Sequence, residues 1–413
     1  MATEPRKGVL LIGWQARAVC ALNDHGAAVT CVLEPADIPK SRLLGLSADV
    51  VVEDVASAEC VAAGLARDGL EIEAFHRICG AREKTVLPAA LVAGARANGA
   101  LEPSSAVALR DKSRQKTLLR QAGVPVADHW VVEDIRRVKD FGGSLPAVVK
   151  PLNGVSTTNT QRIDEGCDWA ELARTMLQTG PVGPWLVESW VSGAEIEVDG
   201  IVRDGNLLFF AVAPYLANLL SVRENEPVGS VALDPKDHGE QYASVRDITE
   251  RSLKALGHGN GVFHLELFET SNGLVFSECA GRPGGGLIYA SLERMFNIDI
   301  YDEWARSVLD VPSGIPANLV EPVASYGWVN LTAPQGRIVC VPDVQKVLEQ
   351  PDVVVAEVDV APGDLMGDVT RASNLRAGRI VVRASDAAAV GARLREVVNW
   401  FAEEAVIRPQ EQE

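Results

Sequence analysis

The sequence lacks several features that would indicate particular classes of protein. It has no run of about 18 apolar residues, the length needed to cross a bilayer, and no signal peptide is recognisable. We therefore expect a cytoplasmic protein without a membrane partner. Its seven cysteines are scattered and never form a C-x-x-C pair, which favours reduced thiols over disulfides or a zinc site. With a net charge of −17, the chain lacks the basic surface that nucleic acids require.

Two motifs of common enzymes are also missing. The first predicted strand ends in Gly13-Trp14 without G-x-G-x-x-G, which argues against a dinucleotide at the first turn. No Ser/His/Asp or Cys/His set is recognisable, so we expect no side-chain nucleophile. What remains is an ordinary globular composition, 47% hydrophobic and 23% charged over 413 residues. This length predicts several domains rather than one core.

Residues 262–287 predict two strands joined by a short turn and followed by a glycine-rich bend. Alternation places His264 and Glu266 on one face of the first strand. A three-residue loop at Ser271–Gly273 sets Glu266 opposite Glu278, with the two side chains about 5 Å apart. Opposed carboxylates are tolerated around a divalent cation, and Mg²⁺ prefers such oxygen ligands. An exposed hairpin with two solvated glutamates is the alternative interpretation.

Two earlier segments have features of phosphate sites. The segment Asp111–Ala122 predicts a helix with Lys112 in its first turn. Leu145–Lys150 predicts a strand that ends in a lysine, and the small, polar loop 153–158 follows it. Backbone amides of such a loop can surround a phosphate. A solvated lysine and a loop without a ligand are the alternatives.

An acidic stripe follows in the predicted strand Ala194–Gly200. Strict alternation places Glu195, Glu197 and Asp199 on one face. Such a stripe is usually a solvated face. The long segment Leu216–Asp237 has no periodicity and predicts a loop that closes over a site.

The order of these elements predicts a mixed α/β chain of four domains. We expect an N-terminal α/β domain and a C-terminal mixed-sheet, β-rich domain, with two lobes between them that hold the phosphate loop and the metal site. The expected boundaries are 1–105, 106–193, 194–318 and 319–413.

Taken together and in order, these pieces resemble the ATP-grasp superfamily, and within it the carboxylate–amine ligases similar to L-amino-acid (dipeptide) ligases and carnosine-synthase-like enzymes. One motif is H-x-E followed by G-x-x-x-x-E-x-x-x-R-x-G-G, matched by His264, Glu266, Gly273, Glu278, Arg282, Gly284 and Gly285. The other is E-x-x-Φ-x-G-x-E, matched by Glu188, Val191, Gly193 and Glu195. The resemblance covers nearly the whole chain and implies an ATP-grasp fold with a pre-ATP-grasp domain before it.

The resemblance implies an ATP site. Lys112 and Lys150 would contact the nucleotide phosphates, with Ser156 and Thr157 in the phosphate loop. The backbone of Glu188–Val191 would read the adenine edge through the Glu188 carbonyl and the Val191 amide. The ribose hydroxyls would be held by Glu195.

The resemblance also implies a metal and a catalytic centre. Glu266 and Glu278 would ligate Mg²⁺, for which Mn²⁺ is the alternative, and Arg282 would face the γ-phosphate and the acyl phosphate. His264 would orient substrate or a metal-binding carboxylate, unless it is a packed, hydrogen-bonded histidine. Many relatives have asparagine where this chain has Ala280, so a third metal ligand is not identified. Because Gly286 has no side chain, we expect room for a large acyl donor.

The implied activity is ATP-dependent ligation of an amino-acid carboxylate to an amine, with release of ADP and phosphate. Small-molecule amino acids would be the substrates, in specialised metabolism, and γ-glutamyl transfer stays open. The resemblance suggests a homodimer. The alternatives are a biotin-carboxylase-like or purine-biosynthesis carboxylating enzyme, and a non-catalytic nucleotide-binding regulatory protein.

Overall fold

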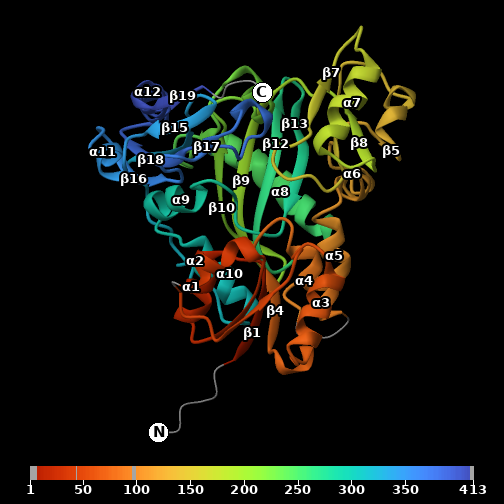
Figure 1. Cartoon of the computed structure of the whole chain (residues 1–413), viewed down its shortest axis with the longest axis vertical. Coiled ribbons are helices and arrows are strands. Elements are labelled where there is room, and N and C mark those ends of the chain that lie inside the picture. Colours follow the sequence, from red (N-terminus) through yellow and green to blue (C-terminus); the bar gives the residue numbers. More distant parts are fainter. Residues whose placement is uncertain (1–6, 43, 95–98, 410–413) are drawn as a thin grey trace.

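The computed structural model describes residues 7–42, 44–94 and 99–409. Figure 1 shows N-terminal elements below a central sheet, with a small lobe at the upper right and the C-terminal elements at the upper left. Helices and strands are interspersed throughout, so the mixed α/β class predicted from the sequence is confirmed. No described helix is both long and apolar enough to cross a membrane.

The N-terminal elements form a parallel sheet with strand order β3-β2-β1-β4, and helices pack on both faces. Gly13 follows β1 with φ of +81°, and an added Cβ would lie 2.5 Å from Thr85. Only glycine suits this strand-to-helix turn. The elements are β1 (Gly8–Ile12), α1 (Ala16–Asp24), β2 (Ala28–Leu33), η1 (Pro35–Asp37), α2 (Ile38–Ser41), β3 (Ala48–Val51), α3 (Ala58–Arg67), η2 (Ile72–Ala74), β4 (Arg77–Gly80), α4 (Val86–Ala93) and α5 (Pro103–Ala108).

The small lobe is an antiparallel sheet with strand order β5-β8-β6-β7. The Asp111 carboxylate accepts a hydrogen bond from the Arg114 amide at 2.8 Å and caps α6. The helix predicted at Asp111–Ala122 is thus confirmed, with those two residues as its caps. The elements are α6 (Lys112–Gln121), β5 (His129–Val132), η3 (Ile135–Asp140), β6 (Ala147–Pro151), β7 (Gln161–Ile163), α7 (Trp169–Thr179) and β8 (Trp185–Ser189).

The central sheet has strand order β10-β9-β12-β13 and buries its apolar face against α8. Ile196 and Val198 of β9 pack there with Leu265 and Leu267 of β12. Because side chains alternate, the acidic residues and His264 lie on the opposite face. The elements are β9 (Ala194–Arg203), β10 (Asn206–Pro214), η4 (Leu219–Glu224), α8 (Gly239–Leu256), β12 (Gly261–Thr270), β13 (Gly273–Ala280), α9 (Ile288–Phe296) and α10 (Ile300–Val308).

The hairpin of β12 and β13 differs in detail from its prediction. Thr270 pairs with Gly273, so the loop has two residues instead of the expected three. The register then shifts between Glu266 and Leu267, where Ser277 is the extra residue of a bulge. The shift brings Glu266 directly opposite Glu278, so this predicted pair is confirmed.

The C-terminal elements form a sheet of order β11-β14-β18-β16 and a smaller one of order β17-β15-β19. The expectation that Leu216–Asp237 is only a loop is wrong. This segment contains the helical turn η4 and the strand β11, which pairs with β14. The elements are β11 (Gly229–Val231), β14 (Ser325–Leu331), β15 (Gly336–Cys340), α11 (Val344–Leu348), β16 (Val353–Val358), β17 (Leu365–Met366), η5 (Val369–Arg371), β18 (Gly378–Ala384), α12 (Ala387–Glu404) and β19 (Val406–Arg408).

The division of the chain into four domains remains a proposal. The N-terminal, small-lobe and central sheets each fall within one expected segment. The C-terminal sheet does not, because β11 lies in the segment 194–318 and hydrogen-bonds to β14 of the last segment.

Candidate active site

A pocket lies between the small lobe and the acidic face of the central sheet. All of the residues predicted to bind nucleotide line it: Lys112, Lys150, Ser156, Thr157, Glu188, Val191, Glu195, Glu266 and Glu278. Arg282 and His264 line an adjacent cavity, which shares Ser156, Glu266 and Glu278 with the pocket. The structure therefore brings all of the predicted site residues into two adjoining cavities.

Two lysines meet the carboxylate of Glu188. Lys150 Nζ lies 2.5 Å from Glu188 Oε1, and Lys116 Nζ lies 2.9 Å from Oε2. Burial alone would raise the pKa of Glu188, but the two lysines outweigh it and lower the pKa to about 2. The side chain of Glu188 is therefore an ionised anchor for both lysines, a contact that the sequence motif did not indicate.

Lys116 was missed by the sequence analysis. Its side chain is 1% exposed, and its Nζ also donates to the Ser277 carbonyl at 2.9 Å. Burial lowers the pKa of Lys116 despite the attraction of Glu188. The spacing of the two lysines could have indicated Lys116 as a site residue, because it lies four residues after Lys112 and therefore on the same face of α6.

Glu266 and Glu278 face each other at the junction of the two cavities. Lys112 Nζ lies 3.1 Å from Glu278 Oε2. Burial would raise the pKa of Glu278, but Lys112 and Lys150 lower it to about 2. On the other side, the Tyr215 hydroxyl donates to Glu266 Oε1 at 3.3 Å. Two opposed carboxylates beside several cations form a donor set that suits a hard divalent ion and its phosphate partners.

The acidic stripe is not a solvated face. Glu195, Glu197 and Asp199 are 7%, 1% and 2% exposed. The Glu195 carboxylate accepts a hydrogen bond from the Leu219 amide at 2.7 Å. Burial, together with the nearby charge of Glu266, raises the pKa of Glu195 to about 8. The predicted solvated stripe is wrong because η4 and β11 cover this face of the sheet.

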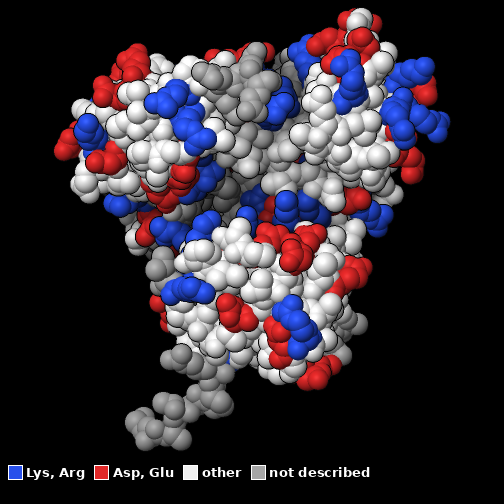
Figure 2. Space-filling model, in the orientation of Figure 1, with Lys and Arg blue, Asp and Glu red and all other residues white. Residues whose placement is uncertain are grey.

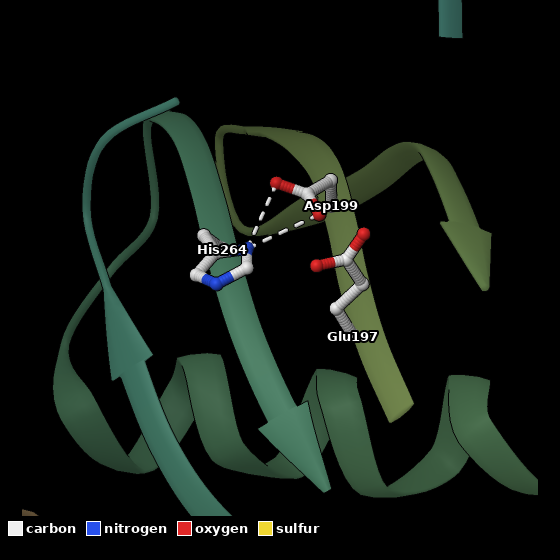
Figure 3. A group of neighbouring side chains, drawn as sticks. All are labelled: Glu197, Asp199 and His264. Atoms are coloured by element: carbon white, nitrogen blue, oxygen red, sulfur yellow. Dashed lines mark hydrogen bonds and ion pairs between the residues drawn. The ribbon is translucent and has the colours of Figure 1, made fainter. Parts of the chain in front are cut away.

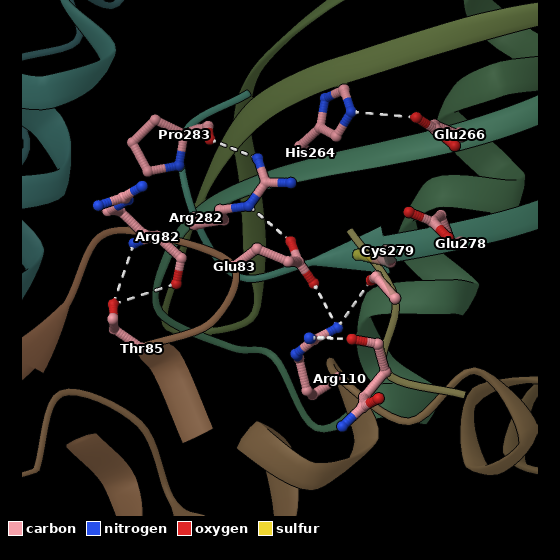
Figure 4. A network of polar contacts seen from close by, with 12 residues as sticks. Arg82, Glu83, Thr85, Arg110, His264, Glu266, Glu278, Cys279, Arg282 and Pro283 are labelled. Atoms are coloured by element: carbon pink, nitrogen blue, oxygen red, sulfur yellow. Dashed lines mark hydrogen bonds and ion pairs between the residues drawn. The ribbon is translucent and has the colours of Figure 1, made fainter. Parts of the chain in front are cut away.

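His264 lies between the carboxylates of Asp199 (Figure 3) and Glu266 (Figure 4). Its Nδ1 is 3.1 Å from both oxygens of Asp199, and its Nε2 is 3.4 Å from Glu266 Oε1. Although burial opposes it, Asp199 raises the pKa of His264 well above its usual range. Glu197 lies beside this pair and completes a cluster whose ligand atoms fall within 4.8 Å of one another. Because Nδ1 already binds Asp199, we interpret the cluster as a support for His264.

Arg282 is held by Glu83, which lies between β4 and α4 (Figure 4). Its Nε donates to Glu83 Oε2 at 2.6 Å, and its Nη1 donates to the Pro283 carbonyl at 2.8 Å. Arg110 donates to Glu83 Oε1 at 3.3 Å and to the Gly154 carbonyl at 3.1 Å. Glu83 therefore bridges the predicted catalytic arginine and Arg110, which in turn holds the phosphate loop, and no local sequence pattern indicates Glu83.

The adjacent cavity is larger, with a volume of about 650 Å³. It lies between the N-terminal elements, the central sheet and the C-terminal sheet. Figure 2 shows a hollow in the viewed face of the molecule, with Lys and Arg side chains at its margin. The arginines that line it are Arg17, Arg82, Arg282, Arg376 and Arg379. In a chain with a net charge of −17, this lining is a local positive region suited to anionic groups.

Gly286 does not enlarge this cavity. Its φ is +59°, and an added Cβ would lie 2.2 Å from the ring of Trp328. The space that a side chain at 286 would take is thus filled by Trp328 from β14. The expectation of extra room for a large acyl donor is wrong at this position.

Comparisons with known proteins agree with this arrangement. Residues 143–291 match an ATP-grasp domain, and residues 330–399 match an L-amino acid ligase C-terminal domain 2. An L-arginine-specific L-amino acid ligase of Bacillus subtilis is 26% identical over 295 residues, which cover 70% of each chain. A D-alanine–D-alanine ligase of Mycolicibacterium gilvum (strain PYR-GCK) is 27% identical over 329 residues, or 74% of this chain and 80% of that one.

The fold is similar to that of a solved ligase. The crystal structure of an L-amino acid ligase from Bacillus licheniformis aligns with a TM-score of 0.79 over 99% of this chain and 100% of that chain. Their sequence identity is 18%, so this likeness concerns the fold alone. The ATP-grasp fold predicted from the sequence is confirmed.

Proposed function

Because the chain is an ATP-grasp carboxylate–amine ligase with an L-amino acid ligase C-terminal domain, we propose that it joins an amino-acid carboxylate to the amine of a second amino acid or peptide. The observation that carries this proposal is the pairing of Glu266 with Glu278 where the nucleotide pocket meets the larger cavity. ATP would lie on one side of this pair and the acid to be activated on the other.

The adenine would lie against the strand that ends in Glu188–Val191. The amides of Ser189 and Trp190 donate to the carbonyls of Asp128 and Pro146 at 2.9 and 3.0 Å. These bonds fix the backbone that leads to Val191 at the pocket wall. The Val191 amide donates to a ring nitrogen, and the backbone of Glu188–Val191 supplies a carbonyl that accepts from the adenine amino group. Glu195 accepts hydrogen bonds from the ribose hydroxyls.

The phosphates would lie among the cations of the pocket. Lys112 and Lys150 bind phosphate oxygens, and Lys116 holds Glu188 in place beneath them. Glu266 and Glu278 are the residues that would hold Mg²⁺, since their carboxylates are opposed and carry the negative charge that a divalent ion requires. When bound, the ion would neutralise phosphate charge as the phosphoryl group moves. His264, fixed by Asp199, orients Glu266.

The chemistry follows from the poor electrophilicity of a carboxylate. One oxygen of the acid attacks the γ-phosphorus of ATP, ADP leaves, and an acyl phosphate forms. The amine nitrogen then attacks the acyl carbon, the C–O bond breaks, and phosphate leaves as the nitrogen loses a proton. Arg282, held by Glu83, stabilises the negative charge that passes through both steps.

Two segments would exclude water from the acyl phosphate. The loop at Thr157 is joined to the C-terminal domain, since the Ser373 amide donates to Thr157 Oγ1 at 2.9 Å. Arg223 of η4 donates to the Thr160 carbonyl at 2.6 Å. These contacts place the phosphate loop and η4 side by side over the pocket, which supports their role as covers.

A phosphate-release screen over all pairs of amino acids, with mass spectrometry of the positives, tests the proposal. ADP, phosphate and a dipeptide or γ-glutamyl product are expected, of the kind made in specialised metabolism. Release of AMP and pyrophosphate would point to adenylation, and dependence on bicarbonate would point to a carboxylating enzyme. No ATP turnover with any pair would favour a regulatory nucleotide-binding protein.

A further inference from the structure

Three polar atoms of the C-terminal sheet are buried without a hydrogen bond to another described residue: Trp328 Nε1, Asn330 Oδ1 and Arg379 Nε. Trp328 and Asn330 are 5% and 3% exposed. All three residues line the larger cavity. A buried polar atom without a partner destabilises the folded protein, so such atoms in residues that line a cavity indicate a bound water or a ligand.

The three atoms come from one face of the sheet. Trp328 and Asn330 are two residues apart on β14 and therefore point to the same side. Arg379 of β18 pairs directly with Asn330 across the ladder. The indole and guanidinium nitrogens are donors, and the amide oxygen is an acceptor. The face therefore offers two N–H groups and one oxygen at neighbouring positions.

This face lies beside the predicted reaction centre. Arg379 Nη1 donates to the Gly286 carbonyl at 3.3 Å. Gly286 itself packs against the ring of Trp328, and it follows Arg282 by one short bend. A group bound at this face is thus close enough to belong to a substrate that reacts near Arg282.

Local charge narrows the kind of group. The Arg379 guanidinium is paired with Glu357, which also lines the cavity and accepts a hydrogen bond from the Tyr289 hydroxyl at 3.3 Å. On this face the charge of Arg379 is therefore balanced by Glu357, while the Trp328 Nε1 and Arg379 Nε donors have no partner among the described residues. Such a face suits a carboxylate that has an amino or amide N–H nearby, as in an α-amino acid, better than a simple amine or a phosphate.

We propose that Trp328, Asn330 and Arg379 form a subsite for the carboxylate of an amino-acid substrate that does not react and remains free in the product. Trp328 Nε1 and Arg379 Nε donate to this carboxylate, and Asn330 Oδ1 accepts from a substrate N–H. The inference rests on the proposed function and adds to it that one substrate must carry a second, unreactive carboxylate. This group is the α-carboxylate of the acceptor or, if a side-chain carboxyl is activated, that of the donor.

The first test uses the unaltered enzyme and each amino-acid pair found by the phosphate-release screen. Each partner is replaced in turn by its α-carboxamide. We expect kcat/KM to fall about tenfold or more for one of the two replacements, in line with the loss of one to two good hydrogen bonds. A fall with the acceptor amide assigns the subsite to the acceptor, and a fall with the donor amide under continued turnover assigns it to the donor. Equal use of acid and amide as acceptor would overturn the proposal, whether the donor amide gives no turnover, because its reacting carboxylate is lost, or is used as well as the donor acid.

The second test is Trp328→Phe, which removes the N–H and keeps a ring against Gly286. We expect KM for the carboxylate-bearing substrate to rise about tenfold with KM for ATP unchanged, and the preference for acid over amide to shrink. A purely structural role would not change that preference. Trp400→Phe is the matched control, since Trp400 lies on α12 of the same domain outside the cavity lining.

The outcomes separate this inference from the proposed function. If Trp328→Phe retains the full preference for acid over amide, a water satisfies the indole and the subsite is wrong, while the ligase function stands. If no amino-acid pair releases phosphate, the proposed function fails and the subsite fails with it.

Discussion

Glu266 lies directly opposite Glu278 because a bulge at Ser277 corrects the register of the hairpin between them. The two carboxylates lie where the pocket between the small lobe and the central sheet adjoins the larger cavity. Each is compensated from a different direction, Glu278 by Lys112 and Glu266 by His264. This opposed pair is the one that we propose would hold a divalent cation.

Glu278→Gln should lower kcat by about 100-fold or more, because it removes one of the opposed carboxylates at the point of phosphoryl transfer. Phosphate release measures the effect, and the circular dichroism spectrum should stay native. Glu293→Gln is the control, since Glu293 is an exposed glutamate on α9. Activity of the Glu278 variant within a few-fold of the parent would remove Glu278 from the site.

Glu83→Gln should lower kcat by about 10–100-fold, because the charge that fixes Arg282 is lost and its guanidinium can turn away from the reacting group. Steady-state kinetics should show a larger change in kcat than in KM for the amino acids. The double variant with Arg282→Gln should be little worse than Arg282→Gln alone, since the two residues act as a unit. Glu102→Gln, at an exposed position, should match the parent. Additive losses in the double variant would contradict this coupling.

Glu188 should make stability depend on pH. Its folded pKa of about 2 lies below the ordinary value of 4.5, so its contribution of about 3 kcal/mol is present above pH 4.5 and is lost as the pH falls from there toward 2. Urea denaturation between pH 7 and 3 should show Glu188→Gln less stable than the parent at pH 7. The gap should narrow below pH 4.5. Glu403→Gln, on the exposed end of α12, should follow the parent, and a gap that stays constant would contradict the assignment.

Gly286→Ala should destabilise the protein by about 2 kcal/mol or more, because its Cβ would overlap the Trp328 ring and its backbone is left-handed. Gly285→Ala is a matched control, since an added Cβ there meets nothing within 4 Å. The measurement is the urea midpoint of each variant. Equal midpoints would show that Trp328 can move away without loss.

The residues that line the pocket between the small lobe and the central sheet could be grouped from the sequence because they lie at short, fixed spacings within single elements, whereas their roles toward a nucleotide remain a proposal. Alternation decided which side chains share a face of β9 and β12. The hairpin loop was predicted one residue too long, and the bulge at Ser277 cancelled this error at Glu278. Alternation alone cannot reveal such a bulge, because it depends on how the two strands pair.

The residues that were missed depend on contacts between distant segments. Glu83 binds Arg282, which follows it by 199 residues, and no local pattern connects the two. Lys116 looks like a surface lysine in sequence and is buried only because β8 and β13 meet α6 there. The acidic stripe of β9 looked solvated for a similar reason, since the segments that cover it come later in the chain.

Strand β11 has a consequence for protein engineering. It precedes β14 by nearly a hundred residues, yet it is the edge strand of the C-terminal sheet and pairs with β14. In a chimaera whose C-terminal elements, β14 included, come from a relative, the relative's β14 would have to pair with β11 of this chain. Gly229–Val231 should therefore be exchanged together with those elements. A truncated chain that ends before β14 would leave the backbone of β11 without its partner strand, and such an unpaired edge can pair with another chain.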